Sequence, residues 1–426
     1  MKVAIINKSD STGGAAVVSF RLMEALRAEG VDARMVVTEK LTDSPCVSVA
    51  APSWRMKIPF LTERLSIFLK NGFSRDTLFK IDTASAGLPL HRNPVVRDAD
   101  VICLNWVNQG MLSLRGLRKL LEMGKPVFWT MHDMWCFTGI CHHAGTCLRY
   151  RLECGECPLL GPKAGPSDMS RKTLLGKKMS YAYGRLEFVA VSNWLAGLAK
   201  KSTLLADLPL HVIPNAFPFP CGPDDACDMS TACAREGKRE LRLMFGAARL
   251  DDPVKGLPIL MEATRILAGE YPDAASHLRL VTFGNLRDPD ALKGVAIPHT
   301  HLGRLNGPEA VRAAYESGDI VVSTSLYETL PGTLVEGLAY GCVPVCFNRG
   351  GQSDIVDHLS TGYIAEWNDS LHIAAENIVK GILWAADAVQ GDPSLRQRMY
   401  NSAWSRFNSG AVACRYIDLF KKALQA

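Results

Sequence analysis

Two glutamates, Glu328 and Glu336, bracket a turn at Pro331–Gly332. The short apolar run at 319–325 precedes the turn and predicts a buried strand, and a short helix is expected after it. The amino end of such a helix carries free N–H groups that bind anions. Two carboxylates there would repel a bare phosphate, so we expect them to face hydroxyl groups. A ligand with both phosphates and hydroxyls suggests a sugar nucleotide.

Two cations, Arg249 and Lys255, stand in one loop at 246–256. The loop joins a predicted strand at 241–245 to a predicted helix at 257–270. Loops that follow parallel strands share one edge of the sheet, so both cations are expected near the glutamate turn. Cations and a helix amino end together fit a pyrophosphate, and they can stabilise a leaving phosphate without a metal ion. The alternative is a pair of ordinary surface charges.

The first half of the chain carries a histidine and a glycine pair in comparable places. His132 follows a predicted strand at 126–130 and could donate a hydrogen bond to a sugar or phosphate, or only cap its loop. Gly13 and Gly14 precede a predicted helix, where they allow close approach of a ligand or form a tight turn. Their loop does not read G-x-G-x-x-G, so it gives little support to a dinucleotide site.

Four cysteines form a further candidate site. Cys154 and Cys157 make a C-x-x-C pair, and Cys141 and Cys147 could complete a tetrahedral structural zinc site. Disulfides and free thiols remain alternatives, because the other spacings in this block are not diagnostic.

Strands and helices alternate in two separate series. The first runs from the strand at 2–6 to a strand at 210–215, and the second from 241 to a mostly helical end after about 370. Residues 216–238 are rich in proline, glycine and aspartate without periodicity, which predicts a linker. The expected fold class is α/β, with two Rossmann-like domains, 1–217 and 218–404, facing each other across a cleft.

Composition limits the function classes. The chain has 426 residues, 47% of them hydrophobic and 21% charged, and a net charge of +5. These values fit a soluble globular protein and give no case for nucleic-acid binding. No signal peptide or apolar run of about 18 residues is visible. Thirteen cysteines, an odd number, then favour reduced thiols and a cytoplasmic location.

A basic, aromatic-rich stretch at 54–80 allows two interpretations. Such a stretch can rest peripherally on the inner face of an anionic membrane. The favoured alternative is a pair of ordinary surface helices with their aromatic side chains packed inward, because Glu63, Asp76 and Asp82 interrupt the basic face.

The glutamate turn resembles the E-x7-E signature of retaining glycosyltransferases of family GT4, which have the two-domain GT-B fold. Further blocks agree through nearly the whole chain. They are Thr12–Gly14, Thr130–Gly139, Val191–Trp194, Val212–Asn215, Lys255–Gly256, His301–Gly303 and Arg349–Val356.

The resemblance implies a role for each candidate residue. Glu336 binds the ribose hydroxyls, and Glu328 and His132 act at the donor sugar as catalytic-site residues. Arg249 and Lys255 hold the pyrophosphate. The backbone around Leu330, Gly332 and Thr333 contacts sugar and phosphate, and Gly13 and Gly14 lie near the phosphate. No cofactor is required for catalysis. The last helix, at about 405–426, packs back on the first domain.

Two positions depart from the family pattern. The arginine-to-lysine spacing is usually five, but Arg249 and Lys255 are six apart, which makes the role of Arg249 less secure. Relatives often carry a histidine where Asn105 stands beside Trp106, so an acceptor contact is expected to differ.

The predicted function is therefore transfer of a sugar from a nucleotide-sugar donor to a glycan or lipid-linked glycan, in surface polysaccharide biosynthesis. The alternatives are a sugar-nucleotide epimerase or hydrolase of the same fold, and a non-catalytic sugar-nucleotide-binding subunit.

Overall fold

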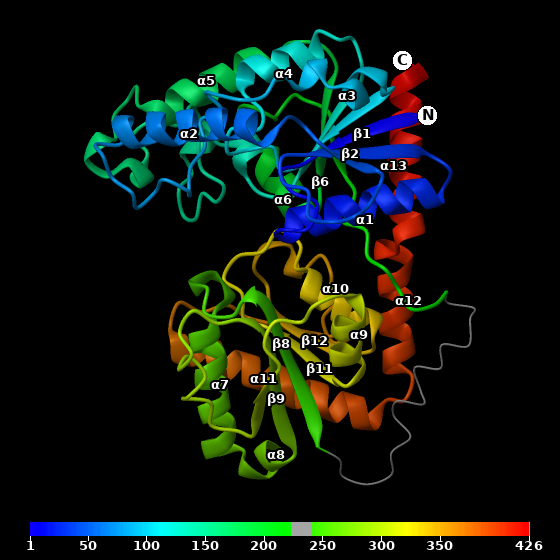
Figure 1. Ribbon diagram of the computed structural model, residues 1–426. Coiled ribbons are helices and arrows are strands. Elements are labelled where there is room, and N and C mark those ends of the chain that lie inside the picture. The colour runs from blue at the N-terminus through cyan, green and yellow to red at the C-terminus, as the bar shows by residue number, and fades with distance from the viewer. Residues whose placement is uncertain (223–239, 426) are drawn as a thin grey trace. The chain divides into compact units, whose positions relative to one another are not determined.

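The computed structural model of the chain describes residues 1–222 and 240–425. It divides into two compact units, Met1–Ala216 with Ser409–Ala426, and Phe217–Asn408 (Figure 1). The predicted linker at 216–238 lies outside the described residues from position 223 onward.

The first unit is built on a seven-stranded sheet in the order β3-β2-β1-β4-β5-β6-β7, and all its strand pairs are parallel. The strands are β1 (Lys2–Ile6), β2 (Asp32–Val37), β3 (Val47–Val49), β4 (Val101–Leu104), β5 (Val127–Met131), β6 (Leu186–Ala190) and β7 (Leu210–Val212). The helices are α1 (Gly14–Ala28), α2 (Ser53–Lys70), α3 (Pro94–Asp98), α4 (Leu114–Leu121), α5 (Met169–Tyr181), α6 (Asn193–Ala199) and α13 (Ser409–Gln425).

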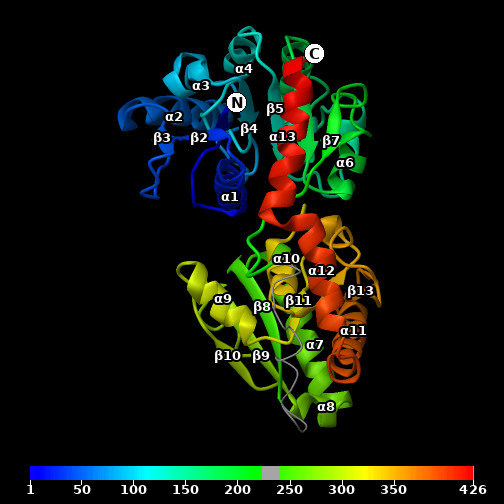
Figure 2. The same ribbon diagram turned by 90° about the vertical axis from the view of Figure 1, so that its right-hand side faces the viewer.

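The carboxyl-terminal helix α13 is part of this first unit, where it runs beside the sheet (Figure 2). Its Phe420 ring packs 5.0 Å from that of Phe128 on β5. The Tyr416 hydroxyl lies 3.0 Å from that of Thr130, which gives this buried polar pair a hydrogen bond. The first sheet therefore takes part of its core from the last residues of the chain.

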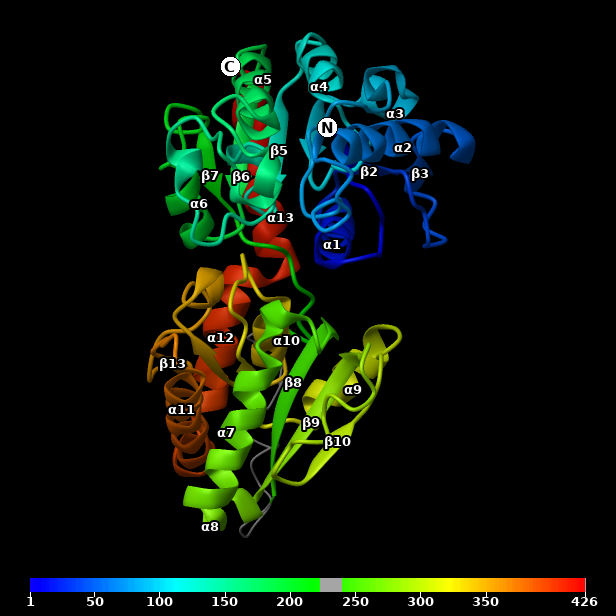
Figure 3. The same cartoon turned by 90° about the vertical axis from the view of Figure 1, so that its left-hand side faces the viewer.

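The second unit has a six-stranded parallel sheet in the order β10-β9-β8-β11-β12-β13. Figure 3 shows its strands β8, β9 and β10 next to one another. Its strands are β8 (Leu241–Arg249), β9 (Leu278–Asn285), β10 (His299–His301), β11 (Ile320–Ser323), β12 (Val343–Phe347) and β13 (Tyr363–Ala365). Its helices are α7 (Leu257–Glu270), α8 (Pro272–Ser276), α9 (Pro308–Glu316), α10 (Gly332–Ala339), α11 (Leu371–Gly391) and α12 (Leu395–Phe407).

Both sheets confirm the predicted α/β class of Rossmann-like units. In each sheet the strand order reverses between two central strands, β1 and β4 in the first and β8 and β11 in the second. Open parallel sheets bind ligands at the carboxyl ends of such a pair. The residues that follow these strands are therefore candidates for a ligand-binding site.

The structure corrects the interpretation of residues 54–80. The favoured prediction was two helices with inward aromatic side chains, but one helix, α2, ends at Lys70. Trp54, Phe73 and Phe79 are exposed, whereas Glu63 and Asp82 are fully buried. Two of the three acidic residues that seemed to break the basic face therefore lie inside the protein, and only Asp76 is exposed.

Candidate functional site

Three loops meet at the carboxyl edge of the second sheet, after β8, β11 and β12. The Thr324 hydroxyl donates to the backbone oxygens of Lys255 and Gly256. Gly256 has φ of 68°, and a Cβ there would lie 2.1 Å from the Thr324 carbonyl oxygen. Gly350 has φ of 70°, and its Cβ would lie 2.1 Å from the Glu328 carbonyl oxygen. Only glycine allows this close packing of the loops.

Lys255 and Glu328 meet at this edge, as the sequence suggests. The ammonium of Lys255 forms an ion pair with Oε1 of Glu328. The hydroxyl of Ser325 donates to the same oxygen at 3.3 Å. Both charged side chains keep partial exposure, 29% for Lys255 and 19% for Glu328. A cation and an anion are therefore held together in reach of a ligand.

Arg249 ends β8 and belongs to a second charged group in the same loop. Its Nη2 lies 2.7 Å from Oδ2 of Asp252, and its Nε lies 3.6 Å from Oδ1 of Asp251. The Nε of Arg249 is buried and has no hydrogen-bond partner within the described residues. Strand β8 runs four residues further than the predicted end at 245. Arg249 is its last residue, so the guanidinium lies at the edge of the sheet.

The predicted anion-binding helix is α10, which begins at Gly332 after buried Leu330. No side chain caps its amino end, so backbone N–H groups of the first turn are available to a ligand. Gly332 and Thr333 are partly exposed at that end, and Glu336 lies half-buried on the next turn. Cations, a carboxylate pair and a helix amino end thus occur along one edge of the second sheet.

The first unit has polar residues at its own carboxyl edge. Nε2 of His132, after β5, lies 2.9 Å from Oδ1 of Asn105, after β4. Because that oxygen only accepts, Nε2 carries the hydrogen. Burial lowers the pKa of His132 to about 4, against the opposing effect of Asp133, so the ring is neutral. Gly13 caps the amino end of α1 and Gly14 is its first residue; both are exposed, with open space where a Cβ would lie.

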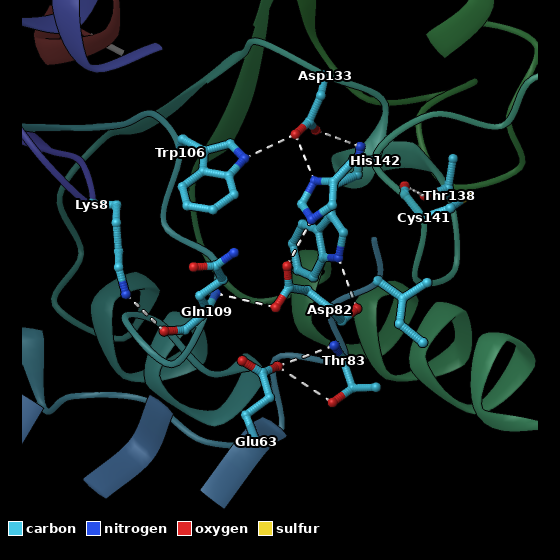
Figure 4. A network of polar contacts seen from close by, with 12 residues as sticks. Lys8, Glu63, Asp82, Thr83, Trp106, Gln109, Asp133, Thr138, Cys141 and His142 are labelled. Carbon is cyan, nitrogen blue, oxygen red and sulfur yellow. Dashed lines mark hydrogen bonds and ion pairs between the residues drawn. The ribbon is translucent and has the colours of Figure 1, made fainter. Parts of the chain in front are cut away.

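A buried network joins the His132 loop to distant segments (Figure 4). His142 lies between two carboxylates, with Nδ1 2.7 Å from Asp133 and Nε2 2.7 Å from Asp82. Burial alone would lower the pKa of His142, but these two carboxylates outweigh it and raise the pKa to about 10. Burial favours the neutral form of Asp133, yet His142 holds its pKa at about 2. The histidine is a fixed cation.

The same network orients an indole ring. Nε1 of Trp106 donates to Asp133 at 3.0 Å, and the backbone N–H of Trp106 donates to Asn7 at 2.8 Å. The Trp106 ring lies 5.7 Å from that of His142. The ring is half-buried, and a fixed aromatic face of this kind can stack on an apolar ligand surface.

The network continues to α2 through a buried arginine. Arg64 forms an ion pair with Asp82 and lies 3.3 Å from Glu63. Burial raises the pKa of Glu63, and Asp82 adds to this effect. Sequence reasoning missed Asp82, Asp133 and His142 as a group. The only signal was the position of Asp133 next to His132, because Asp82 and His142 are sixty residues apart.

The four candidate cysteines line one small cavity of about 20 Å³. Its lining comes from a long loop with little regular structure, and Cys154, Gly155 and Glu156 in the C-x-x-C turn all have positive φ. Among residues 1–222 and 240–425, however, no three His, Cys, Asp or Glu side chains are placed to hold a metal ion. The four are free thiols, whereas Cys221 is disulfide-bonded, contrary to the expectation of reduced thiols throughout.

No helix in the described part of the chain is both long and apolar enough to span a bilayer.

The family model described as "Glycosyl transferases group 1" matches residues 242–381, the core of the second unit. An uncharacterized glycosyltransferase of Haemophilus influenzae is 29% identical over 150 residues, which is 34% of this chain. The match spans about 38% of the length of that relative.

Solved structures match over the full chain. HepE of Anabaena in complex with UDP-glucose has a TM-score of 0.59 at 14% identity, with 99% of this chain and 100% of that chain covered. Sucrose-phosphate synthase of Thermosynechococcus elongatus has a TM-score of 0.60 at 15% identity, with 100% and 99% covered. At these identities the likeness establishes the GT-B fold alone.

Proposed function

Residues 242–381 belong to the glycosyl transferases group 1 family, GT4, and from this premise we propose that the chain transfers a sugar from a nucleotide-sugar donor to a glycan or lipid-linked glycan acceptor. We further propose that the anomeric configuration is retained and that the product belongs to a surface polysaccharide. UDP-glucose, bound in the HepE structure, is the first donor to test.

One observation carries this proposal. The ion pair between Lys255 and Glu328 lies where the loops after β8 and β11 meet, at the strand-order reversal of the second sheet. The uncapped amino end of α10 follows in the same β11–α10 connection. This edge offers cations and N–H groups to a diphosphate and carboxylates to hydroxyls, which are the two chemical parts of a sugar nucleotide.

The proposed roles follow from these chemical types. Lys255 and Arg249 bind the pyrophosphate, and the α10 N–H groups at Gly332 and Thr333, with the backbone at Leu330, add hydrogen bonds. Glu336 accepts hydrogen bonds from the ribose hydroxyls. Glu328 lies at the donor sugar, next to the cation that binds its phosphate.

The transfer step needs charge stabilisation at one oxygen. The bond between the anomeric carbon and the phosphate oxygen breaks, and the diphosphate leaves with the electron pair. The acceptor hydroxyl forms the new bond and gives its proton to the leaving phosphate. Lys255, Arg249 and the α10 N–H groups would stabilise the charge that develops on the diphosphate.

Residues of the first unit complete the proposal. We assign His132 to the donor sugar, where its neutral ring would take part in hydrogen bonding, and Gly13 and Gly14 to a ligand that approaches the backbone closely. Trp106 is assigned to the acceptor, because an indole held by Asp133 offers a rigid stacking face.

Incubation with labelled nucleotide sugars tests this function against its alternatives. A transferase forms a labelled product only when a glycan or lipid-linked acceptor from a membrane extract is added. An epimerase or hydrolase changes the donor without an acceptor, and a binding subunit leaves the donor unchanged. Either of the last two results would replace the proposed function.

A structural zinc ion among Cys141, Cys147, Cys154 and Cys157 also stays a proposal. Its support is the cavity that the four residues share and the positive φ values of the C-x-x-C turn. The four sulfurs would have to move closer to bind an ion, since they are not placed as ligands.

A further inference from the structure

The outer face of α2 carries a continuous stripe of large apolar side chains. Five exposed residues form it, with 51–60% of each side chain open to solvent: Trp54, Ile58, Leu61, Leu65 and Leu69. At about 100° per residue they fall within an arc of about 80° on one side of the helix. Phe73 and Phe79, exposed by 66% and 60%, follow directly after α2.

The buried face of α2 carries two charged residues beside the apolar Pro59 and Ile67. Glu63 is fully buried, and Arg64 is exposed by only 5% and pairs with buried Asp82. A helix that only covers a soluble domain shows the reverse arrangement, with apolar residues inside and charges outside. Large exposed apolar patches with this kind of order mark interaction surfaces. Within residues 1–222 and 240–425 the stripe stays exposed, as expected of a surface that binds a partner.

Charge identifies the partner. Between Ser53 and Lys80 the exposed charged side chains are five cations and one anion, which gives +5 − 1 = +4. They are Arg55, Lys57, Lys70, Arg75 and Lys80 against Asp76. A positive surface of this size opposes pairing with its own copy and favours an anionic partner. Apolar and aromatic side chains flanked by lysine and arginine are the composition of helices that lie in a membrane interface.

We propose that the outer face of α2, with the segment up to Lys80, docks the protein on an anionic lipid bilayer surface. The apolar stripe enters the boundary between headgroups and acyl chains, and the cations contact anionic headgroups. The helix runs along the periphery of the first unit (Figures 1 and 3), and the residues of the stripe are exposed to solvent. Binding does not depend on the proposed transferase activity, so the two can fail separately.

Vesicle flotation of the full chain tests the proposal. We expect the protein to float with phosphatidylglycerol–phosphatidylcholine vesicles and to remain unbound with pure phosphatidylcholine. The triple variant Ile58→Gln/Leu61→Gln/Leu65→Gln should lower the partition coefficient at least tenfold. The matched control, Leu359→Gln/Leu371→Gln/Ile373→Gln, removes exposed apolar residues of the second unit and should bind like the wild type.

A charge variant separates the two contributions. Arg55→Gln/Lys57→Gln/Lys70→Gln should weaken binding to anionic vesicles several-fold and flatten its dependence on salt. The control Lys293→Gln/Lys421→Gln/Lys422→Gln removes three exposed lysines elsewhere and should leave binding unchanged.

A spectroscopic readout on the unaltered stripe guards against a folding defect in the variants. Vesicles with brominated acyl chains should quench part of the tryptophan fluorescence, and Trp54→Phe should remove most of that quenching. No vesicle binding by the wild type, or equal binding by the stripe variant, overturns the proposal. So does a dimer in light scattering that the stripe variant converts to monomer, because the stripe would then bind a second copy.

Discussion

The ammonium of Lys255 is paired with the carboxylate of Glu328 across two loops of the second unit. The cation that we assign to the pyrophosphate is therefore paired with the carboxylate that we assign to the donor sugar. A diphosphate that binds here must compete with Glu328 for Lys255. The pair therefore sets the local charge at this edge of the second sheet.

Replacing Glu328 with Gln should separate binding from turnover. The amide removes the competing charge, so Lys255 is free for a phosphate and the Kd for UDP should fall several-fold. Transfer should drop at least 100-fold, because the carboxylate at the donor sugar is lost. Titration calorimetry and a transfer assay measure the two effects. Glu366→Gln, an exposed change in the same unit, should alter neither. Weaker UDP binding by Glu328→Gln would contradict the competition.

Glu336→Ala should weaken binding only where the ligand has ribose hydroxyls. A carboxylate that accepts from hydroxyls contributes about 1.5–3 kcal/mol, or roughly 10- to 150-fold in Kd. We expect that loss for UDP and almost none for 2′,3′-dideoxy-UDP, measured by calorimetry. Equal losses for both nucleotides would assign Glu336 a structural role in α10 instead.

The buried imidazolium of His142 should make stability depend on pH. Its pKa is raised from 6.5 to about 10 in the folded protein, so its contribution is complete below pH 6.5 and disappears as pH rises through 10. The loss should be on the order of a few kcal/mol. Urea unfolding at pH 6.5, 8.5 and 10 measures it. The low pKa of Asp133 has the opposite effect in acid: its contribution to stability is lost as the pH falls from 3.8 through 2.

His142→Gln leaves Asp82 and Asp133 buried without their shared cation and should destabilise the protein at pH 7 by about 3–5 kcal/mol. It should also remove most of the decline between pH 6.5 and 10. His299→Gln is the control, because this exposed histidine lies outside the network. An unchanged pH profile in His142→Gln would show that another group titrates.

The cysteine cavity predicts one bound zinc ion per chain. Protein purified under reducing conditions should contain stoichiometric zinc by elemental analysis, and a chelator should lower the melting temperature. Cys147→Ser should lose the metal, whereas Cys414→Ser, at an exposed free thiol, should keep it. Absence of zinc from the wild-type protein, or a disulfide among the four residues in mass spectrometry, would end the zinc proposal.

Much of the fold was accessible from sequence because it depends on local patterns. The β-branched run before the glutamate turn forms β11, and the turn leads into α10 as expected. The predicted helix at 257–270 has the bounds of α7. The three-residue strands β3, β10 and β13 were not predicted, because a run of three residues shows no periodicity. Such a strand forms through pairing with the adjacent strand of the sheet.

The candidate sites were accessible to different degrees. The meeting of Lys255 and Glu328 could be anticipated, because loops after adjacent parallel strands share an edge. The group of Asp82, Asp133 and His142 could not, since it joins segments far apart in sequence through side chains of common types. The prediction that the aromatic side chains of this segment pack inward was wrong for a related reason. The ion pair between Arg64 and Asp82 draws Arg64 into the interior, and five large apolar side chains of α2 are left exposed, against the usual rule for an amphipathic helix.

Titration of nucleotides into the wild-type chain and Lys255→Ala tests the central claim most directly. The panel contains UDP, UDP-glucose, ADP-glucose, GDP-mannose and the corresponding nucleosides. We predict that at least one sugar nucleotide binds the wild type, and that Lys255→Ala weakens it by about 10- to 150-fold, the value of a charge-assisted hydrogen bond. Weak nucleoside binding should not change. Failure of every sugar nucleotide to bind, or equal binding by Lys255→Ala, would contradict a donor site at this edge of the second sheet.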